Sequence, residues 1–278
     1  MRVYISADIE GVTGLVSWSQ CGRPNSQHYD FAFARRMMTH DVNAAVRGAR
    51  AGGATFIRIK DSHGNSKNLL VDELEPGVEL VSGHGAGADG MMEGLDDSFD
   101  AALLIGYHAR AGTLGGIMEH TITGGIHRMW VNGAEMGEIG LSSAAAGHKG
   151  VPIAFVSSDA AGCREASELL GVPTAVVKEG YGRYMGKMLH PEETSTLIGD
   201  GVMNALSASL RSPFVLDEPV TIRVEFNRAE EADWVGRAPE VKRVDGYTCE
   251  LSAGSFAQAH RAFWVMIGLS AAGARSGD

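Results

Sequence analysis

The chain has 278 residues, of which 44% are hydrophobic and 21% charged, and this is the composition of an ordinary globular protein. Acidic residues outnumber Lys and Arg by 34 to 24, and no basic run occurs, which argues against nucleic acid or an anionic membrane as a partner. The acidic excess suits cation binding, and it equally suits solubility.

The N-terminal segment reads directly as a strand, without a signal-peptide pattern or a long apolar run. We therefore expect a cytoplasmic protein with no membrane span. The cysteines, Cys21, Cys163 and Cys249, are odd in number and far apart. They are expected to be reduced thiols rather than a disulfide framework or a zinc knuckle.

The first half of the chain alternates predicted strands and helices. An apolar strand at residues 3–7 precedes a helix at residues 29–50, which carries an apolar stripe and ends at Gly52-Gly53. A second strand at residues 55–60 follows at once, which indicates a parallel strand-helix-strand unit. Further strands are predicted at residues 78–81, 101–105, 152–157 and 173–178, and further helices at residues 139–148 and 160–170, the latter capped by Asp159.

Two features depart from this alternation. Asn132-Gly133, between residues 129–131 and 134–136, predicts a tight hairpin. After about residue 188 the pattern becomes a helix at 190–210 ended by Pro213, strands at 220–226 and 247–251, and a final helix at 255–272. We therefore predict an α/β fold, with a mostly parallel sheet flanked by helices over residues 1–188 and a smaller α+β subdomain over residues 189–278.

The stretch Ser6-Ala7-Asp8-Ile9-Glu10-Gly11 follows the first strand and carries two carboxylates. Residues i and i+2 of a strand point to the same side, so Asp8 and Glu10 would share one pocket. Two such carboxylates repel each other unless a proton or a cation neutralises them, and Gly11 would then allow a sharp turn. Taken alone, the pair could also cap the next turn or face solvent.

Two histidines, His63 and His108, also follow predicted strands, and such strand ends share one rim of a parallel sheet. His120 and Glu138 reach the same region from neighbouring segments. Carboxylates and imidazoles together are typical ligands of zinc, manganese or iron, and the histidine content favours zinc. Asp8, Glu10, His63, His108 and Glu138 exceed the needs of one catalytic zinc, and they suit two metals that share a bridging carboxylate.

The other histidines are interpreted as structural or surface residues. Glu119 would face away from His120 in an extended segment, so it receives no chemical role. The histidines in this group are His28, His40, His84, His127, His148, His190 and His260.

Five ordered motifs resemble those of the D-aminopeptidases of the DppA type, peptidase family M55. They are SxDxEG at residues 6–11, DSH at 61–63, GYHA at 106–109, MxH at 118–120 and GEIG at 137–140. The resemblance covers most of the chain and is weakest in the last ninety or so residues. It implies that Asp8 bridges two Zn²⁺ ions per subunit, with Glu10 and His63 completing one site and His108 and Glu138 the other. His120 would be the catalytic residue without binding metal, either moving a proton or forming a transient covalent intermediate.

The resemblance further implies a cytoplasmic two-zinc aminopeptidase that acts on short peptides with a free N-terminus, with D-aminoacyl substrates expected. It also implies a homo-oligomer, a decamer, that admits di- and tripeptides but excludes folded proteins. Trp234 and Trp264 could contribute to subunit contacts or fill the core of the C-terminal subdomain.

Two other functions remain open at this point. A two-metal phosphoesterase would use similar ligands, although only Arg110 is placed to hold phosphate. A non-catalytic peptide- or metal-binding protein linked to peptide uptake is the second alternative.

Overall fold

The computed structural model describes residues 1–21, 30–85, 87 and 89–276. Its main sheet has seven strands, all parallel except for the antiparallel pairing of the last two. In spatial order the strands are β3 (Glu79–Val81), β2 (Phe56–Asp61), β1 (Arg2–Ala7), β4 (Ala101–Ile105), β7 (Ile153–Asp159), β8 (Thr174–Gly182) and β9 (Met185–Met188). The mostly parallel sheet predicted from the sequence is confirmed.

The strand order gives the main sheet a switch point. The chain runs outward from β1 through β2 to β3, and the next strand in sequence, β4, lies on the other side of β1. Connections from these two strands therefore leave in opposite directions, and the crevice beyond their carboxyl ends is where open α/β sheets bind ligands. Both strands are apolar and buried, as strands covered on two faces should be.

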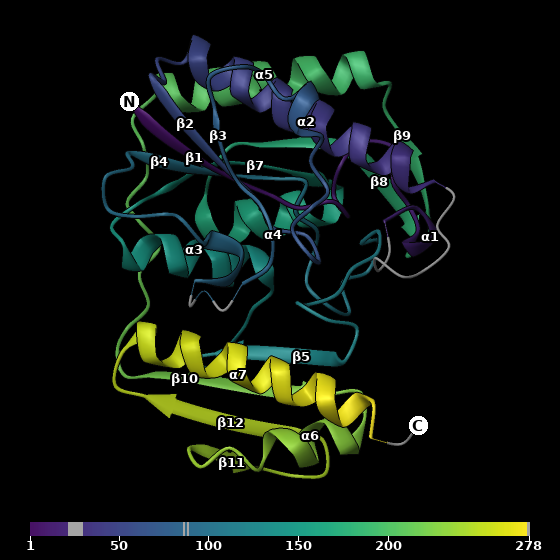
Figure 1. Cartoon of the computed structure of the whole chain (residues 1–278), viewed down its shortest axis with the longest axis vertical. Helices are drawn as coiled ribbons and strands as arrows, with labels where there is room; N and C mark the ends of the chain where they lie inside the picture. Colours follow the sequence, from purple (N-terminus) through teal and green to yellow (C-terminus); the bar gives the residue numbers. More distant parts are fainter. Residues whose placement is uncertain (22–29, 86, 88, 277–278) are drawn as a thin grey trace.

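Helices cover both faces of the main sheet (Figure 1). On one face, α2 (Phe31–Ala51) and α5 (Pro191–Ser207) pack over Ile5 and Leu103. On the other face, α3 (Glu138–His148) and α4 (Ala160–Leu170) lie beside a second core that includes Tyr4 and Leu104. Alternate residues of the same strand thus enter different cores, as the two-residue period of a strand requires.

Local signals in the sequence account for several helix ends. Gly52 follows the last residue of α2, and the Asp159 side chain accepts a hydrogen bond from Gly162 N at the start of α4, as predicted. His190 caps α5 and Pro191 occupies its first position. The expected end at Pro213 is wrong, because α5 already ends at Ser207 and Ala208 adopts an extended conformation.

A second, antiparallel sheet lies below the α/β layers in Figure 1. Its hairpin turns at Asn132 and Gly133, both with positive φ, which confirms the tight turn. The helices α6 (Ala229–Val235) and α7 (Phe256–Ala274) pack against this sheet. Its strands in spatial order are β11 (Val241–Arg243), β12 (Thr248–Ala253), β10 (Val220–Phe226), β5 (Ile126–Val131) and β6 (Ala134–Glu135).

The second sheet takes strands from both sides of residue 188. Strands β5 and β6 precede that position, whereas β10, β11 and β12 follow it. Helix α5 also follows it and packs on α2 of the α/β layers. The division at residue 188 stays a prediction, and a cut there would separate the strands of one sheet.

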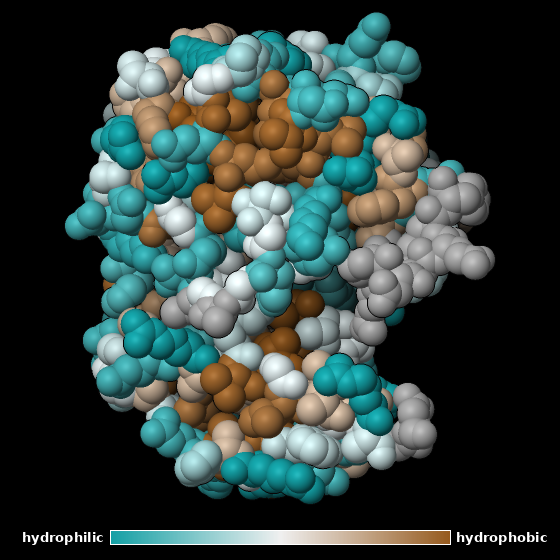
Figure 2. Space-filling model, viewed as in Figure 1, coloured by the Kyte–Doolittle hydropathy of each residue, from teal (hydrophilic) through white to brown (hydrophobic). Residues whose placement is uncertain are grey.

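Several short elements were not predicted: α1 (Trp18–Cys21), the 3₁₀ turns η1 (Val71–Glu73) and η2 (Gly90–Met92), β9, α6 and β11. Within the described residues, no helix is both long and apolar enough to cross a membrane. Figure 2 shows a mainly polar face with two apolar areas, one in its upper half and one in its lower half, where α7 and the antiparallel sheet lie.

Candidate functional site

The six residues singled out in the sequence converge at the carboxyl edge of the main sheet. Asp8 and Glu10 follow β1, and His63 and His108 follow β2 and β4. Glu138 is the first residue of α3, and His120 lies in the connection between β4 and β5. All six are at least largely buried, and together they are called the ligand cluster below.

Gly11 allows two loops of the ligand cluster to approach closely. Its N–H donates to Gly106 O at 2.8 Å, and a Cβ at this position would lie 1.7 Å from Tyr107 O. The turn expected at Gly11 is present, since Val12 N donates to Ile9 O at 3.3 Å, and the residue with left-handed φ in this loop is Gly14. Glycine is required at position 11 because the loop before His108 occupies the space of a side chain.

The ligand cluster has two halves that meet at Asp8. On one side, His63 Nδ1 lies 3.0 Å from Glu10 Oε2 and 3.4 Å from Asp8 Oδ1. On the other side, His108 Nε2 lies 3.5 Å from Asp8 Oδ2 and 3.3 Å from Glu138 Oε1. The two oxygens of Asp8 therefore face different partners.

Backbone carbonyls fix the three histidine rings of the cluster. His63 Nε2 donates to Cys21 O, His108 Nδ1 donates to Ala109 O, and each of these distances is 3.0 Å. His120 Nδ1 donates to Met118 O, also at 3.0 Å. The remaining nitrogen of each ring faces the carboxylates, which is the usual arrangement of metal-ligating histidines.

His120 stands beside the second half of the cluster. Its ring stacks on that of His108, with centroids 4.1 Å apart, and the edge of Trp18 packs against it. Its Nε2 lies 3.6 Å from Glu138 Oε1. His108, His120 and Glu138 can hold a metal ion by their spacing, and so can Asp8, Glu10 and His108. Geometry alone therefore leaves His120 either as a ligand or as a neighbour of the metal.

Burial and the charges of the cluster's own residues set the pKa values of its three carboxyl groups. Burial and then the charge of Glu10 raise the pKa of Asp8 to about 7. Burial opposes ionisation of Glu10 and Glu138 as well, but His63 and His108 outweigh it and lower the pKa of both carboxyls. Asp8 Oδ2 and His108 Nε2 are buried without a hydrogen-bond partner. A divalent cation between them would satisfy both atoms, so the residues fit a metal.

His120 differs from the other two histidines in its electrostatics. Burial, and then the neighbouring His108, lower the pKa of His120 to about 4. By contrast, burial is outweighed at His63 and His108 by Glu10 and Glu138, which raise the pKa of those imidazoles. His120 is therefore the imidazole of this site that stays neutral at pH 7 and can accept a proton.

The sequence did not reveal Lys178, which touches the loop that carries Glu10. This buried lysine of β8 donates to the carbonyls of Glu10, Val12 and Leu15, and burial lowers its pKa to about 8. Its neighbours Val176 and Glu179 are exposed, so the sequence of β8 did not indicate that this lysine is buried. Its contacts were not predictable because they involve backbone oxygens.

The other polar residues considered have partners elsewhere. Glu119 accepts from Gly112 N and lies 3.6 Å from Arg183 Nε. Arg110 is held near Glu165, with Nη1 3.6 Å from Oε2. Among the remaining histidines, His40 pairs with Asp41, His127 with Asn227, and His190 caps α5, whereas His28 lies outside the described residues. Cys21, Cys163 and Cys249 are free and buried, as expected.

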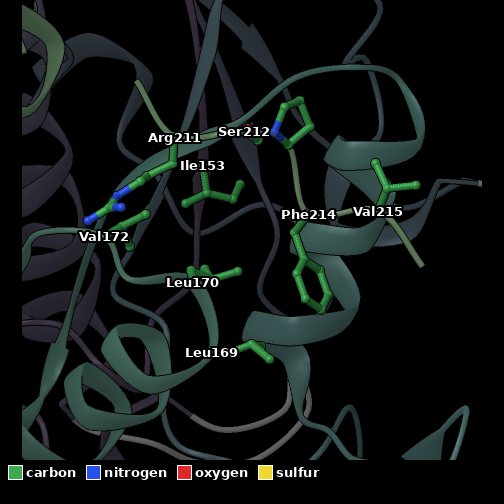
Figure 3. Close-up of a pocket in the computed structure, with 9 residues that line it drawn as sticks. Ile153, Leu169, Leu170, Val172, Arg211, Ser212, Phe214 and Val215 are labelled. Atoms are coloured by element: carbon green, nitrogen blue, oxygen red, sulfur yellow. The ribbon is translucent and has the colours of Figure 1, made fainter. Parts of the chain in front are cut away.

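Two pockets lie away from the ligand cluster. One, of about 220 Å³, is lined by Ile153 at the start of β7, the end of α4 and the segment before β10 (Figure 3). It therefore opens at the amino edge of the main sheet, opposite the cluster. The other, of about 420 Å³, lies on the antiparallel sheet beside Trp130 and Arg223.

Fold and site together define a doubly wound α/β protein whose buried ligand cluster, at the switch point of the main sheet, fits a divalent metal. The chain matches the family model of peptidase M55, D-aminopeptidase, over residues 1–265. It belongs to this family, and the resemblance seen in its motifs is confirmed.

Two comparisons cover nearly the whole chain. The D-aminopeptidase of Bacillus subtilis (strain 168) is 32% identical over 275 residues, which are 97% of this chain and 98% of the relative. The solved structure of the Zn-dependent D-aminopeptidase DppA from Bacillus subtilis, described as a self-compartmentalizing protease, matches with a TM-score of 0.92. That match has 32% identity and covers 98% of each chain.

Proposed function

We propose that the protein is a zinc-dependent aminopeptidase that removes the N-terminal residue of short peptides, with D-aminoacyl peptides as substrates. Two Zn²⁺ ions per subunit would be held by the ligand cluster. Asp8 would bridge them, Glu10 and His63 would complete one site, and His108 and Glu138 the other.

The observation that carries this proposal is the division of the cluster at Asp8. Its Oδ1 faces His63 and its Oδ2 faces His108, at 3.4 and 3.5 Å. Two ligand atoms at bonding distance from a tetrahedral zinc lie about 3.3 Å apart. The spacings in both halves of the cluster, from 3.0 to 3.5 Å, agree with this value.

When bound, the zinc ions would supply Lewis acidity and lower the pKa of water. The chain's own residues would supply proton transfer and orientation. His120, with its Nδ1–H held by Met118 O, keeps Nε2 free to take a proton and return it to the departing amine. Trp18 and His108 both pack against the ring of His120 and orient it.

The buried carboxylates also suit a substrate with a free amino terminus, because an ammonium group can lie beside them. The comparisons support peptide hydrolysis over phosphate-ester hydrolysis or simple binding. The ion pair of Arg110 with Glu165 further weakens the phosphoesterase alternative, since this was the arginine expected to hold phosphate.

The proposal extends to assembly and compartment. Because the Bacillus subtilis relative is described as self-compartmentalizing, we propose a closed homo-oligomer, a decamer, that restricts access to short peptides. The cytoplasm remains the compartment proposed from the sequence.

The test combines metal analysis with a substrate panel. Purified protein should contain two zinc ions per subunit and release the first residue from free D-aminoacyl di- and tripeptides. N-acetylated peptides and chromogenic phosphate esters should remain intact. Phosphate release without peptide cleavage, or peptide binding without turnover, would refute the proposal.

A further inference from the structure

One buried ammonium group, that of Lys178, binds the backbone of the loop that follows β1. Lys178 Nζ lies 2.5 Å from Glu10 O, 2.8 Å from Val12 O and 2.7 Å from Leu15 O. An ammonium group has three protons, so these bonds use all of them. Within the described part of the chain, the Lys178 ammonium group thus donates only to the loop of residues 10–15, which carries the ligand Glu10.

Packing alone does not explain a lysine at this position, because burying its charge is energetically unfavourable. Lys178 is 1% exposed, and among the described residues no carboxylate lies within 4.0 Å of its Nζ. Asp159 and Asp41 act on this buried charge only from farther away, so it has a large desolvation cost that an apolar side chain of similar volume would avoid. Unlike an apolar side chain, the ammonium group can donate hydrogen bonds to three carbonyls at once and so hold them in place.

A buried carboxylate holds the same loop through its donors. Asp41 of α2 is fully buried, and its Oδ2 accepts from Thr13 N at 2.9 Å. Thr13 Oγ1 donates to Asp41 Oδ1, also at 2.9 Å. Carbonyls of the loop therefore face a positive group, and the N–H and hydroxyl of Thr13 face a negative one.

The contacts of Lys178 and Asp41 with this loop restrain the backbone of Glu10. The side chain of Glu10 lies beside Asp8 in the cluster, and like charges at this distance push each other apart. Its carbonyl is held by Lys178, and the next residue, Gly11, is pressed against Tyr107 O. Backbone movement that would carry the carboxylate away from the cluster is blocked at both points.

We propose that Lys178 is a positioning residue for the metal centre, which fixes the backbone of Glu10 so that its carboxylate stays at the zinc site, with Asp41 and Thr13 restraining the same loop from the other side. This inference rests on the zinc site proposed above. Groups that orient metal ligands typically change metal affinity by about 10- to 100-fold when they are removed.

The test measures zinc affinity rather than activity. We expect Lys178→Met to bind zinc about 10- to 100-fold more weakly than the wild type in competition with a chelating dye. Phe263→Leu is the matched control, because Phe263 is fully buried in the core beside the antiparallel sheet and has no contact with the loop. It should lower the melting temperature and leave zinc affinity unchanged, which separates positioning from general loss of stability.

A milder second variant keeps the test decisive if Lys178→Met does not fold. Thr13→Val preserves shape and removes the hydroxyl bond to Asp41, and we expect weaker zinc binding by a smaller factor. Unchanged affinity in the folded variants, with normal binding by the wild type, would overturn this inference alone. A wild-type protein that binds no zinc would overturn the proposed function and the inference together.

Discussion

Replacement of Asp8 by asparagine should stabilise the metal-free protein and destabilise the zinc-loaded one. Without metal, burial and Glu10 raise the pKa of Asp8 from 3.8 to about 7, so the folded state resists its ionisation. The sign follows from linkage: the folded state holds the proton more tightly, and stability is lost as pH rises from about 4 to about 7. The asparagine side chain would carry no charge and would still accept from Ile9 N.

The magnitude follows from the size of this pKa shift. At about 1.4 kcal/mol per pKa unit, ionised Asp8 costs on the order of 4 kcal/mol at pH 8. Allowing for the coupling to Glu10, we expect Asp8→Asn to gain about 2–4 kcal/mol in the metal-free state. For a chain of this size that corresponds to about 3–7 °C in melting temperature. The gain should be smaller at pH 5.5, where much of the penalty has not yet developed.

Added zinc should reverse the order of the two melting temperatures, so that the wild type melts above Asp8→Asn. A ligand present at about 100 times its dissociation constant stabilises the folded state by about 2.7 kcal/mol per site. The wild type gains this stabilisation, whereas Asp8→Asn loses the bridging carboxylate. The assay is thermal unfolding at pH 8 and pH 5.5, after chelator dialysis and again with zinc added.

Asp61→Asn is the matched control for this experiment. Asp61 is equally buried, but its oxygens accept from Asn68 N, Asn68 Nδ2 and Leu69 N, so its charge is well satisfied. Asp61→Asn should therefore destabilise the metal-free protein. The reasoning is refuted if metal-free Asp8→Asn at pH 8 melts below the wild type, as Asp61→Asn does.

Three further outcomes are expected. His120→Ala should keep both zinc ions and lose about 10²- to 10⁴-fold in turnover, whereas loss of metal on elemental analysis would make His120 a ligand. His63→Ala and His108→Ala should each lose mainly one zinc ion, because the two residues lie in different halves of the cluster, and equal loss of both ions would contradict that division. Light scattering should find a large homo-oligomer, and activity assays should show that it cleaves tripeptides but not folded proteins. A fully active monomer would exclude a closed compartment.

The sequence predicted the main sheet well because its signals are local and strong. Residues 101–105 form an unbroken apolar run, and they coincide with β4. Asn132-Gly133 predicted its hairpin because few residue pairs adopt two consecutive positive φ angles. The pairing of that hairpin with β10 was not predictable, since it joins segments about ninety residues apart and depends on how two cores fit together.

Short elements were missed for a different reason. Strand β9 spans Met185–Met188 and alternates between half-buried and exposed residues at the edge of the sheet. Such a segment has no apolar run and pairs only with β8. Its sequence therefore resembles a loop, and only the neighbouring strand makes it extended.

The site shows the same limit at the level of single atoms. Zinc accepts few side-chain types, so Asp8, His63 and His108 could be recognised once their strand ends were predicted to share a rim. The groups that orient these ligands act through backbone oxygens, as Cys21 O does for His63 and Met118 O for His120. Any residue supplies a carbonyl, so nothing in its identity marks such a role. Lys178 differs from these residues, because donating to three carbonyls at once requires a cationic side chain, but its burial depends on packing against the loop of residues 10–15 and could not be predicted from the sequence of β8.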